Sequence, residues 1–302
     1  MNGFKENSRV CFIGDSITHN NGYVSHIVGY YRENLPERKV KFYNCGVSGG
    51  NLDTVFSNFE GDIMRHNPTH AVIMIGINDS YRGALTEFPK NERYAVLKNA
   101  YDEYKANLKK LYNMLNDRGV EVILCTPTPY FEYTESDVEP LRGGYALMLG
   151  YAEFVRAFAK EKGLKLCDYH AYITEIAQLE TLVNPDHVHP NPDGHFYMAK
   201  HFLGFQGYDL GENREIPGFL DAWREKVAKV RDIWATEHHV IKDRSLTSEE
   251  CVEKAKWFIE NGENNRYKEY FSGLCEKYIE LKPMQARLEK EADEIMDRLY
   301  EK

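Results

Sequence analysis

The sequence predicts an α/β protein of three layers: a flavodoxin-like fold with a central parallel sheet of about five strands, followed by a C-terminal helical extension. Two patterns carry this prediction. Short apolar runs alternate with longer amphipathic stretches over the first two thirds of the chain, and each run is apolar at consecutive positions. Alternation of this kind is typical of βαβ units, and continuous apolar runs are typical of strands that helices cover on both faces.

Five apolar runs are the expected strands, and each is followed by a Gly, Cys-Gly, Thr-Pro or Asp. They lie at residues 10–13, 40–44, 71–75, 120–125 and 164–167. Helices are expected between them, beginning near Tyr23 and Leu52 and spanning about 91–118 and 144–162. The default strand order of a flavodoxin-like sheet is 2-1-3-4-5, and we expect it here.

The composition of the chain changes after about Gly207, where Glu, Lys and Arg become more frequent and strand-like runs stop. A capping box at 247–250 and Pro283 each indicate the start of a helix. We therefore expect a main domain, 1–207, and an extension of two to four helices, 208–302. Packing on the main domain is favoured over a separate functional module. Two other roles of these helices are left as alternatives: they could form a homo-oligomer, or they could cover the entrance to the functional site.

Charge and composition exclude some classes of partner. The 302 residues include 42% hydrophobic and 28% charged side chains, an ordinary balance, and the formal net charge is -9. Such a chain lacks the cationic surface that nucleic acids and acidic membranes require. The N-terminus has no apolar signal segment, and no apolar run is long enough to span a bilayer. We expect a cytoplasmic protein without nucleic-acid or membrane partners.

Six cysteines are scattered through the chain without a Cys-x-x-Cys pair, and three of the first four lie inside strand-like apolar runs. Buried, reduced thiols are the expectation for such positions. The spacings favour neither a disulfide framework nor a zinc site. The residues are Cys11, Cys45, Cys125, Cys167, Cys251 and Cys275.

Chemistry is expected just after each strand, since ligands of open α/β sheets bind beyond the carboxyl ends of the strands. The first strand ends in Gly14-Asp15-Ser16, at the start of a helix. Gly14 permits a tight turn, and the Ser16 hydroxyl can then point into the crevice, where helix amides favour developing negative charge. Taken alone, however, this motif is more typical of a serine that only caps a helix.

The second and third strand ends offer hydrogen-bond donors. The second is followed by two adjacent glycines, Gly49 and Gly50, whose backbone N–H groups can bind a ligand oxygen. A loop that needs positive φ would use the same residues. The third strand is followed by Asn78, whose side-chain amide is either such a donor or part of an Asx turn.

A carboxylate and an imidazole stand together much later in the chain. Asp186 and His189 are three residues apart on a tight loop bounded by Pro185 and Pro190. In that geometry the carboxylate can hold the Nδ1–H of the imidazole, which leaves Nε2 as a general base. With a serine and amide donors at the strand ends, this pair completes the groups that acyl transfer needs.

In this combination the sequence resembles the SGNH/GDSL hydrolase family. Four blocks match in family order, at 14–18, 46–49, 76–79 and 186–190. Each block alone is weakly specific, whereas the set is highly specific and covers roughly residues 8–205. The first block reads Gly-Asp-Ser-Ile instead of Gly-Asp-Ser-Leu, and the segment after Gly207 has no counterpart in the resemblance.

The resemblance implies a mechanism. Ser16 would be the nucleophile, His189 the base and Asp186 the residue that orients this base. The backbone N–H groups of Ser16 and Gly49 and the Asn78 side chain would form the oxyanion hole. No metal or organic cofactor is required. The expected partner is a small-molecule or oligosaccharide ester.

Three competing assignments are weaker. His187 is adjacent to Asp186, so their side chains should diverge, and His189 is favoured as the base. Zinc held by the three histidines His187, His189 and His195 with Asp186 is disfavoured by the competing Ser-Gly-Asn set. Cys45 as a nucleophile has no evident histidine partner in the sequence.

Substrate contacts are expected from Asp15, Tyr81, Arg82 and Tyr130, although Asp15 is better suited to holding the turn. Aromatic rings at a pocket rim suit sugars, although packing is their commoner use, and no long apolar lid is evident. We therefore expect a serine esterase for short acyl groups, above all acetyl, on a carbohydrate or another small ester. The alternatives are a thioesterase or lysophospholipase with the same triad, and a non-catalytic carbohydrate- or acyl-binding module on the same fold.

Overall fold

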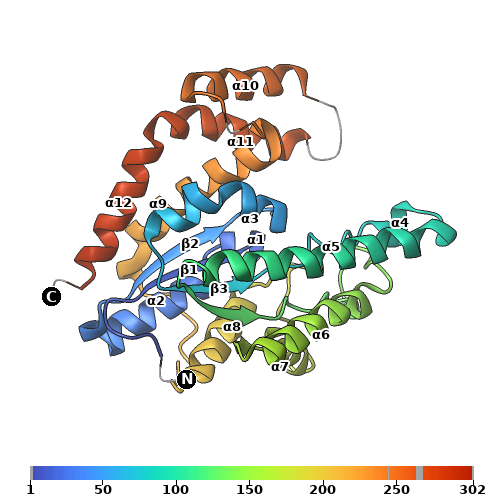
Figure 1. Ribbon diagram of the computed structural model, residues 1–302, viewed down its shortest axis with the longest axis horizontal. Helices are drawn as coiled ribbons and strands as arrows, with labels where there is room; N and C mark the ends of the chain where they lie inside the picture. The colour runs from blue at the N-terminus through green and yellow to red at the C-terminus, as the bar shows by residue number, and fades with distance from the viewer. Residues whose placement is uncertain (1–2, 244, 263–267, 301–302) are drawn as a thin grey trace.

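The computed structural model describes residues 3–243, 245–262 and 268–300, and its centre is a five-stranded sheet (Figure 1). The strand order is β2-β1-β3-β4-β5, which confirms the flavodoxin-like layout, and every neighbouring pair is parallel. The strands are Arg9–Gly14 (β1), Lys41–Gly46 (β2), His70–Met74 (β3), Glu121–Cys125 (β4) and Lys165–Cys167 (β5). The order reverses between β1 and β3, so a ligand is expected beyond the carboxyl ends of these two strands.

Helices cover both faces of the sheet and confirm the three layers (Figure 1). One face carries α2 (Gly22–Asn34), α7 (Tyr169–Ile176) and α8 (Pro192–Phe205), and the other carries α3 (Leu52–Asn58), α5 (Lys90–Asn116) and α6 (Gly144–Lys162). Successive side chains of a strand point to opposite faces. Phe12 therefore packs with the first group of helices, and Cys11 and Ile13 pack with the second.

Two four-residue α-helices also lie in this part of the chain. α1 (Ser16–His19) follows β1 directly, and α4 (Ala84–Glu87), which the sequence pattern does not predict, precedes α5. The six cysteines are buried and free, which confirms the expectation for the three that lie in strand-like runs, Cys11, Cys125 and Cys167. Among the helices of the described residues, none is both long and apolar enough to cross a membrane.

The C-terminal extension contains α9 (Asp221–Thr236), α10 (Ser248–Asn261), α11 (Lys268–Leu281) and α12 (Gln285–Arg298). The expected capping box is present, since Thr247 and Glu250 exchange side-chain-to-backbone hydrogen bonds at the start of α10. α9 and α12 lie against the edge strand β2 (Figure 1). Beyond α12, the Tyr300 hydroxyl donates to the Val40 carbonyl at 2.7 Å. Covering an edge strand in this way prevents it from pairing with another chain.

The apolar stripes of the extension are buried within the chain. Trp223 and Val227 of α9 and Met296 of α12 join the core on the α2 side of the sheet. A further core lies between α9, α10 and α11 and includes Val47, which belongs to the loop after β2. The extension therefore packs both on the main fold and on itself.

A buried ion pair also joins the extension to the main fold. The Arg231 guanidinium of α9 donates to both carboxylate oxygens of Asp62, each at 2.6 Å, and the two residues are 2% and 1% exposed. A bidentate pair has a fixed geometry, so it determines how α9 lies against the segment that follows α3.

Candidate active site

Ser16 is the first residue of α1, directly beyond the carboxyl end of β1. Asp15 caps this helix, because its carboxylate accepts a hydrogen bond from the Ile17 amide at 2.9 Å. A Cβ on Gly14 would lie only 2.7 Å from the Met74 carbonyl oxygen of β3, so glycine is needed where these strands end. The turn therefore holds Ser16 at the edge of the sheet.

Asp15 is 2% exposed, and this burial raises the pKa of its carboxyl group to about 6. The Ile17 amide, His189 and Arg82 each lower the pKa, but together by less than burial raises it. Asp15 is thus the buried N-cap of the helix that begins at Ser16.

A chain of hydrogen bonds joins Ser16 to two residues that are distant in the sequence. Ser16 Oγ lies 2.7 Å from His189 Nε2, and His189 Nδ1 lies 2.5 Å from Asp186 Oδ2. The other carboxylate oxygen of Asp186 accepts from the amides of Val188 and His189 at 3.0 and 2.9 Å. The loop thus fixes its own carboxylate, and the imidazole lies between this carboxylate and the hydroxyl.

The loop that carries these two residues has a defined shape. A bridge between Val183 and Pro190 closes it, and the Asn184 amide donates to the His189 carbonyl at 2.8 Å. Asn191 then caps α8, with Pro192 in the first helical position, where both residue types are favoured. Local sequence therefore explains why the loop ends where it does.

Asp186 is held in its charged form. Burial alone would raise its pKa. The amide and imidazole of His189 and the amide of Val188 lower the pKa by more than burial raises it, so it lies below its usual range. An ionised Asp186 accepts the Nδ1–H of His189, which leaves the Nε2 lone pair facing Ser16. This arrangement can take the proton from a serine hydroxyl and stabilise the positive charge that results.

The loops after β2 and β3 are tied to each other and to the end of β1. The Val47 amide donates to the Gly14 carbonyl at 3.1 Å, and Asn78 Nδ2 donates to the Gly50 carbonyl at 2.9 Å. Gly49 has a φ of +70°, a conformation that favours glycine. The four sequence motifs therefore come together at one edge of the sheet.

Arg82 supports Asn78. Its guanidinium donates to the Ile77 carbonyl at 2.9 Å and to Asn78 Oδ1 at 3.3 Å. This contact orients the carboxamide so that its nitrogen faces Gly50. Tyr81, by contrast, has a positive φ and is 51% exposed, so it lies at the surface.

Asp79, the last residue of the third motif, ties the loop after β3 to the start of α3. Its Oδ1 accepts from the Leu52 amide at 3.0 Å. Burial raises the pKa of Asp79 to about 7; the Leu52 amide lowers it, while Asp15 and Asp53 raise it further. Because this carboxyl group binds its proton more tightly in the folded state, the free energy of unfolding falls as the pH rises toward 7.

The cleft at Ser16 is small, with a volume of about 200 Å³. Its lining includes Asn20 and His195, which had no predicted contact with Ser16. Asn20 lies four residues after Ser16, a spacing that places two helical residues on one face and could have revealed it. Burial lowers the pKa of His195 to about 3, so its ring is neutral, and its Nδ1 accepts from the Tyr23 amide at 3.3 Å.

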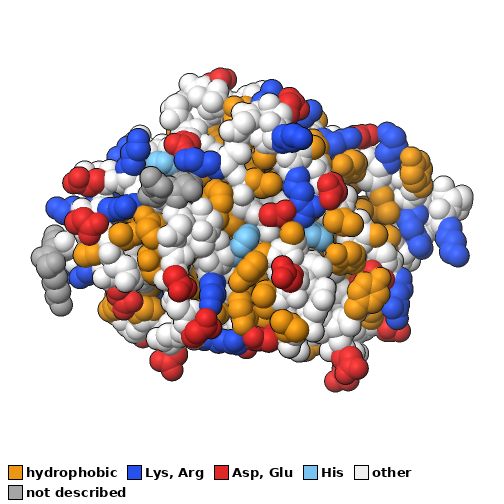
Figure 2. Space-filling view, turned by 90° about the horizontal axis from the view of Figure 1, so that it is seen from below, with side chains coloured by type: hydrophobic (Ala, Val, Ile, Leu, Met, Phe, Trp, Pro, Cys, Tyr) orange, Lys and Arg blue, Asp and Glu red, His pale blue; other side chains and the backbone are white. Residues whose placement is uncertain are grey.

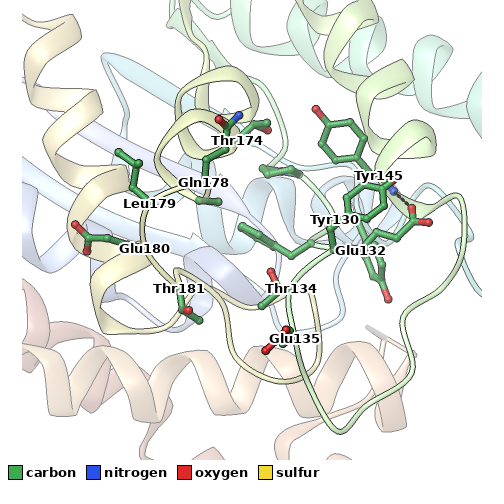
Figure 3. A pocket seen from close by; sticks show the side chains of 14 residues that line it. Tyr130, Glu132, Thr134, Glu135, Tyr145, Thr174, Gln178, Leu179, Glu180 and Thr181 are labelled. Atoms are coloured by element: carbon green, nitrogen blue, oxygen red, sulfur yellow. Dashed lines mark hydrogen bonds between the residues drawn. The ribbon is translucent and has the colours of Figure 1, made fainter.

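Tyr130 lines a second, larger cavity of about 650 Å³ (Figure 3). One wall comes from the loop after β4 and the start of α6, and it carries Tyr130, Glu132 and Tyr145. The opposite wall comes from α7 and the loop after it, and it includes Thr174 and Gln178. The cavity is thus lined by aromatic rings together with carboxylate, hydroxyl and amide groups.

This cavity adjoins the loop that carries Asp186. The Phe131 amide donates to the His187 carbonyl at 3.0 Å, and the Ser136 hydroxyl donates to the Pro185 carbonyl at 2.6 Å. Hydrogen bonds therefore hold the segment that forms this wall to the loop that carries Asp186.

The competing base and nucleophile have other contacts. His187 is 1% exposed, and its ring nitrogens lie 3.0 and 2.6 Å from the carbonyl oxygens of Phe131 and Val138. Cys45 is buried, and burial raises the pKa of its thiol well above the usual range, so it stays protonated.

The histidines around Asp186 do not form a cluster of metal ligands in the described part of the chain. The one close group of three metal-binding side chains there is Cys45, Asp62 and His66. Both carboxylate oxygens of Asp62 already bind Arg231.

Fold and site together define a hydrolase of the serine class, in which a hydroxyl next to an imidazole attacks an acyl group. Comparison with known families makes this specific. Residues 12–196 match the GDSL-like Lipase/Acylhydrolase family, and the chain belongs to this family, which confirms the resemblance seen in the four motifs. The protein is therefore an enzyme that hydrolyses ester bonds.

Two relatives show how much of the chain is shared. An acetylxylan esterase from Geobacillus stearothermophilus is 32% identical over 225 residues, covering 68% of this chain and 97% of that protein. The crystal structure of Axe2, an acetylxylan esterase from the same organism, matches with a TM-score of 0.58 and 27% identity, over 70% of this chain and 100% of that one.

A second similar structure covers the whole length of the chain. BT4096, a gut microbial diltiazem-metabolizing enzyme, matches 100% of this chain and 96% of its own with a TM-score of 0.82, at 17% identity. At this identity the likeness concerns the fold alone. It indicates that the extended fold occurs in another protein.

Proposed function

We propose that the protein is a serine esterase that removes short acyl groups, chiefly acetyl, from carbohydrate esters. The observation that carries this proposal is the continuous hydrogen-bond chain from Asp186 through His189 to Ser16, with distances of 2.5 and 2.7 Å. A binding module without catalysis has no need for such a chain.

The first half of the reaction forms an acyl-enzyme. Ser16 Oγ attacks the ester carbonyl carbon while His189 Nε2 takes its proton, and the carbonyl oxygen becomes an oxyanion. The N–H groups of Ser16 and Gly49 and one N–H of Asn78 stabilise this charge. His189 then gives the proton to the leaving alcohol oxygen as the ester bond breaks.

The second half releases the acid. Water attacks the acyl-serine carbonyl while His189 takes a proton from it, and the same donors bind the second oxyanion. The bond to Ser16 Oγ breaks, Oγ regains its proton from His189, and the carboxylic acid leaves. Asp186 stays ionised throughout and stabilises the imidazolium, consistent with its lowered pKa.

The hydrogen bonds of Asn78 suit it to the donor role. One hydrogen of Nδ2 is directed to the Gly50 carbonyl, and Arg82 binds Oδ1. The carboxamide is therefore held in one orientation, and its second N–H has a fixed direction. Preorganised donors of this kind need no rearrangement as charge develops.

The size of the cleft supports a short acyl group. Its volume of about 200 Å³ is below the range of roughly 300–1,000 Å³ that is typical of pockets for larger ligands. A relative named acetylxylan esterase at 32% identity supports acetyl in particular.

The larger cavity supports a carbohydrate as the alcohol part of the ester. Tyrosine rings provide apolar faces on which sugar rings can stack. Tyr133 and Tyr145 keep exposed surface in this cavity, whereas Tyr130 and Glu132 are buried in its wall, and Gln178 adds an exposed amide. Because this cavity adjoins the Asp186 loop, it can hold sugar units beyond the acetylated one.

Rates on a set of esters test this proposal. We expect turnover of p-nitrophenyl acetate to exceed that of the octanoate and palmitate esters, and we expect acetate release from acetylated xylo-oligosaccharides. Ser16→Ala should abolish both activities. Faster turnover of the long-chain esters would contradict the acyl preference, and a faster reaction with acetyl-coenzyme A would favour a thioesterase.

A further inference from the structure

The extension touches the loop that the proposed mechanism uses for the oxyanion. The contact comes from the π-helical turn Glu237–Ile241, which follows α9. His239 Nε2 lies 2.8 Å from the Ser48 carbonyl oxygen. A Cβ on Gly49 would come within 2.5 Å of the same imidazole ring, so the ring packs directly on the Gly49 backbone.

This contact acts on one particular peptide unit. The Ser48 carbonyl and the Gly49 N–H belong to the same planar peptide, and in its trans form the two groups point in opposite directions. A hydrogen bond donated by His239 to the carbonyl oxygen therefore fixes the direction of the N–H. It also polarises the peptide, which strengthens the N–H as a donor.

The preceding peptide unit, which contains the Ser48 N–H, is also held by a histidine. The Ser48 amide donates to His19 Nδ1 at 3.2 Å, and His19 Nε2 faces Asp232 of α9 at 3.7 Å. Burial lowers the pKa of both His19 and His239, so each ring is neutral at pH 7 and donates from one nitrogen. The Ser48 hydroxyl also lies 3.1 Å from the Tyr270 hydroxyl of α11.

An apolar contact anchors the start of the same loop. Val47 is 3% exposed and packs in the core formed by α9, α10 and α11, with Ile233 and Trp234 among its members. The extension therefore holds the loop after β2 by both packing and hydrogen bonds. A displacement of about 1 Å at a catalytic group can lower a rate a hundredfold, so such support has consequences for catalysis.

We propose that His239 is a positioning residue of the esterase, which aims the Gly49 N–H at the oxyanion by donating a hydrogen bond to the Ser48 carbonyl. The extension then completes the active site in addition to covering the edge of β2. This inference rests on the proposed function, because it requires that Gly49 stabilises an oxyanion.

Substitutions of His239 in the full chain test the inference. His239→Ala removes the ring, His239→Phe keeps a ring without a donor, and His239→Gln keeps a donor. His238→Ala is the matched control, because His238 lies in the same turn but contacts Thr54 Oγ1, at 3.0 Å. For each variant, kcat and KM are measured with p-nitrophenyl acetate, together with the melting temperature.

We expect kcat to fall about tenfold or more in His239→Ala and His239→Phe, with KM within about twofold of the wild type. An interaction that matters only in the transition state has this signature. His239→Gln should recover most of kcat, and His238→Ala should stay near the wild type. If His239→Ala does not fold, the comparison of His239→Phe with His239→Gln decides the question.

Two results would overturn the inference. One is a wild-type kcat in folded His239→Phe, and the other is an equal loss in His238→Ala and His239→Ala. The failure of the proposed function looks different. Wild-type protein that prefers long-chain esters would contradict the acyl preference and leave the role of His239 to be decided by the variants, whereas wild-type protein that hydrolyses no ester would contradict both proposals.

Discussion

At the scale of single residues, Asp186 illustrates how hydrogen bonds can lower the pKa of a carboxyl group by more than partial burial raises it. Its side chain is 47% exposed, yet its pKa lies below the usual range because two backbone amides and an imidazole direct their N–H groups at it. The charge needed beside His189 is therefore supplied by the local loop and does not depend on a buried site.

We predict that Asp186→Asn lowers kcat by about 10²–10⁴ and leaves the fold intact, because an asparagine does not accept the Nδ1–H and favours the wrong imidazole tautomer. The measurement is kcat for p-nitrophenyl acetate, with far-ultraviolet circular dichroism as a check on folding. A rate within a few fold of the wild type would mean that Asp186 does not orient His189.

Asp79 gives a prediction about pH. Its folded pKa of about 7 lies above the ordinary value of 3.8, so the folded state binds this proton more tightly than the unfolded state. The stability that it contributes is complete below about pH 4 and is lost as the pH rises through 7. Asparagine resembles the protonated form and keeps an acceptor for the Leu52 amide.

Asp79→Asn should therefore be more stable than the wild type at pH 8, by about 1 kcal/mol or more, with a flatter dependence of the unfolding free energy between pH 4 and 7. Urea unfolding at several pH values measures this. Asp53→Asn, at an exposed neighbouring position, is the control. An equal pH dependence in wild type and Asp79→Asn would show that Asp79 is ionised in the folded state.

A site residue can be predicted from the sequence when a short motif around it marks its role. Ser16 and Asn78 each stand in a short motif that follows a strand, so fold rules alone bring them to one edge of the sheet. The Asp186–His189 pair also stands in a short motif, but on a loop between α7 and α8. His239 has no such motif and is 190 residues from Gly49 in the sequence, so only the packing of the extension reveals it. Tyr130 follows a strand end too, yet it lines the neighbouring cavity, because side-chain direction is not visible in sequence spacing.

At the scale of elements, the loop after β2 depends on glycine for two separate reasons. Gly49 has a φ of +70°, and a Cβ there would lie 2.5 Å from the His239 ring. Gly119 is a natural comparison, since it has a φ of +72° but no atom within 4 Å of the same Cβ position.

We predict that Gly49→Ala lowers both stability and kcat, whereas Gly119→Ala lowers stability alone, by about 1–2 kcal/mol for the left-handed conformation. For Gly49→Ala the loss should be larger, and kcat should fall at least tenfold, since the loop must move away from the ring. The measurements are urea unfolding and ester hydrolysis. Similar effects of the two substitutions on kcat would argue against a tightly packed oxyanion loop.

The strands were predictable as elements because each is a short, continuously apolar run with a clear stop, and five such runs with helices between them leave one default order. The extension was predictable only as helices. An apolar stripe shows that a helix face is buried, but it does not identify the surface that buries it, so the contact of α9 and α12 with β2 came from the structure.

At the scale of the whole molecule, the extension and the main fold share cores, an ion pair and the loop beside Ser16. The acetylxylan esterase relative matches 68% of the chain, whereas the BT4096 structure matches all of it. The division at 207 and 208 and the formation of a homo-oligomer through the extension stay predictions.

We predict that Arg231→Met lowers the free energy of unfolding by about 3–5 kcal/mol, because it leaves the buried Asp62 carboxylate without its partner. The double variant Asp62→Leu with Arg231→Met should recover much of this loss, since no unpaired charge remains. Urea unfolding of the two variants and the wild type measures both effects. A loss below about 1 kcal/mol in Arg231→Met would show that this pair does not hold the extension in place.

Ser16 is the nucleophile of the proposed reaction, and covalent labelling identifies a nucleophilic serine. The folded protein is treated with a fluorophosphonate, and the adduct is located by mass spectrometry of its peptides, with Ser16→Ala treated in parallel. We predict one adduct, on Ser16, in the wild type and none in Ser16→Ala. An adduct on another residue that persists in Ser16→Ala, or an unlabelled wild type that still hydrolyses p-nitrophenyl acetate, would show that Ser16 is not the nucleophile.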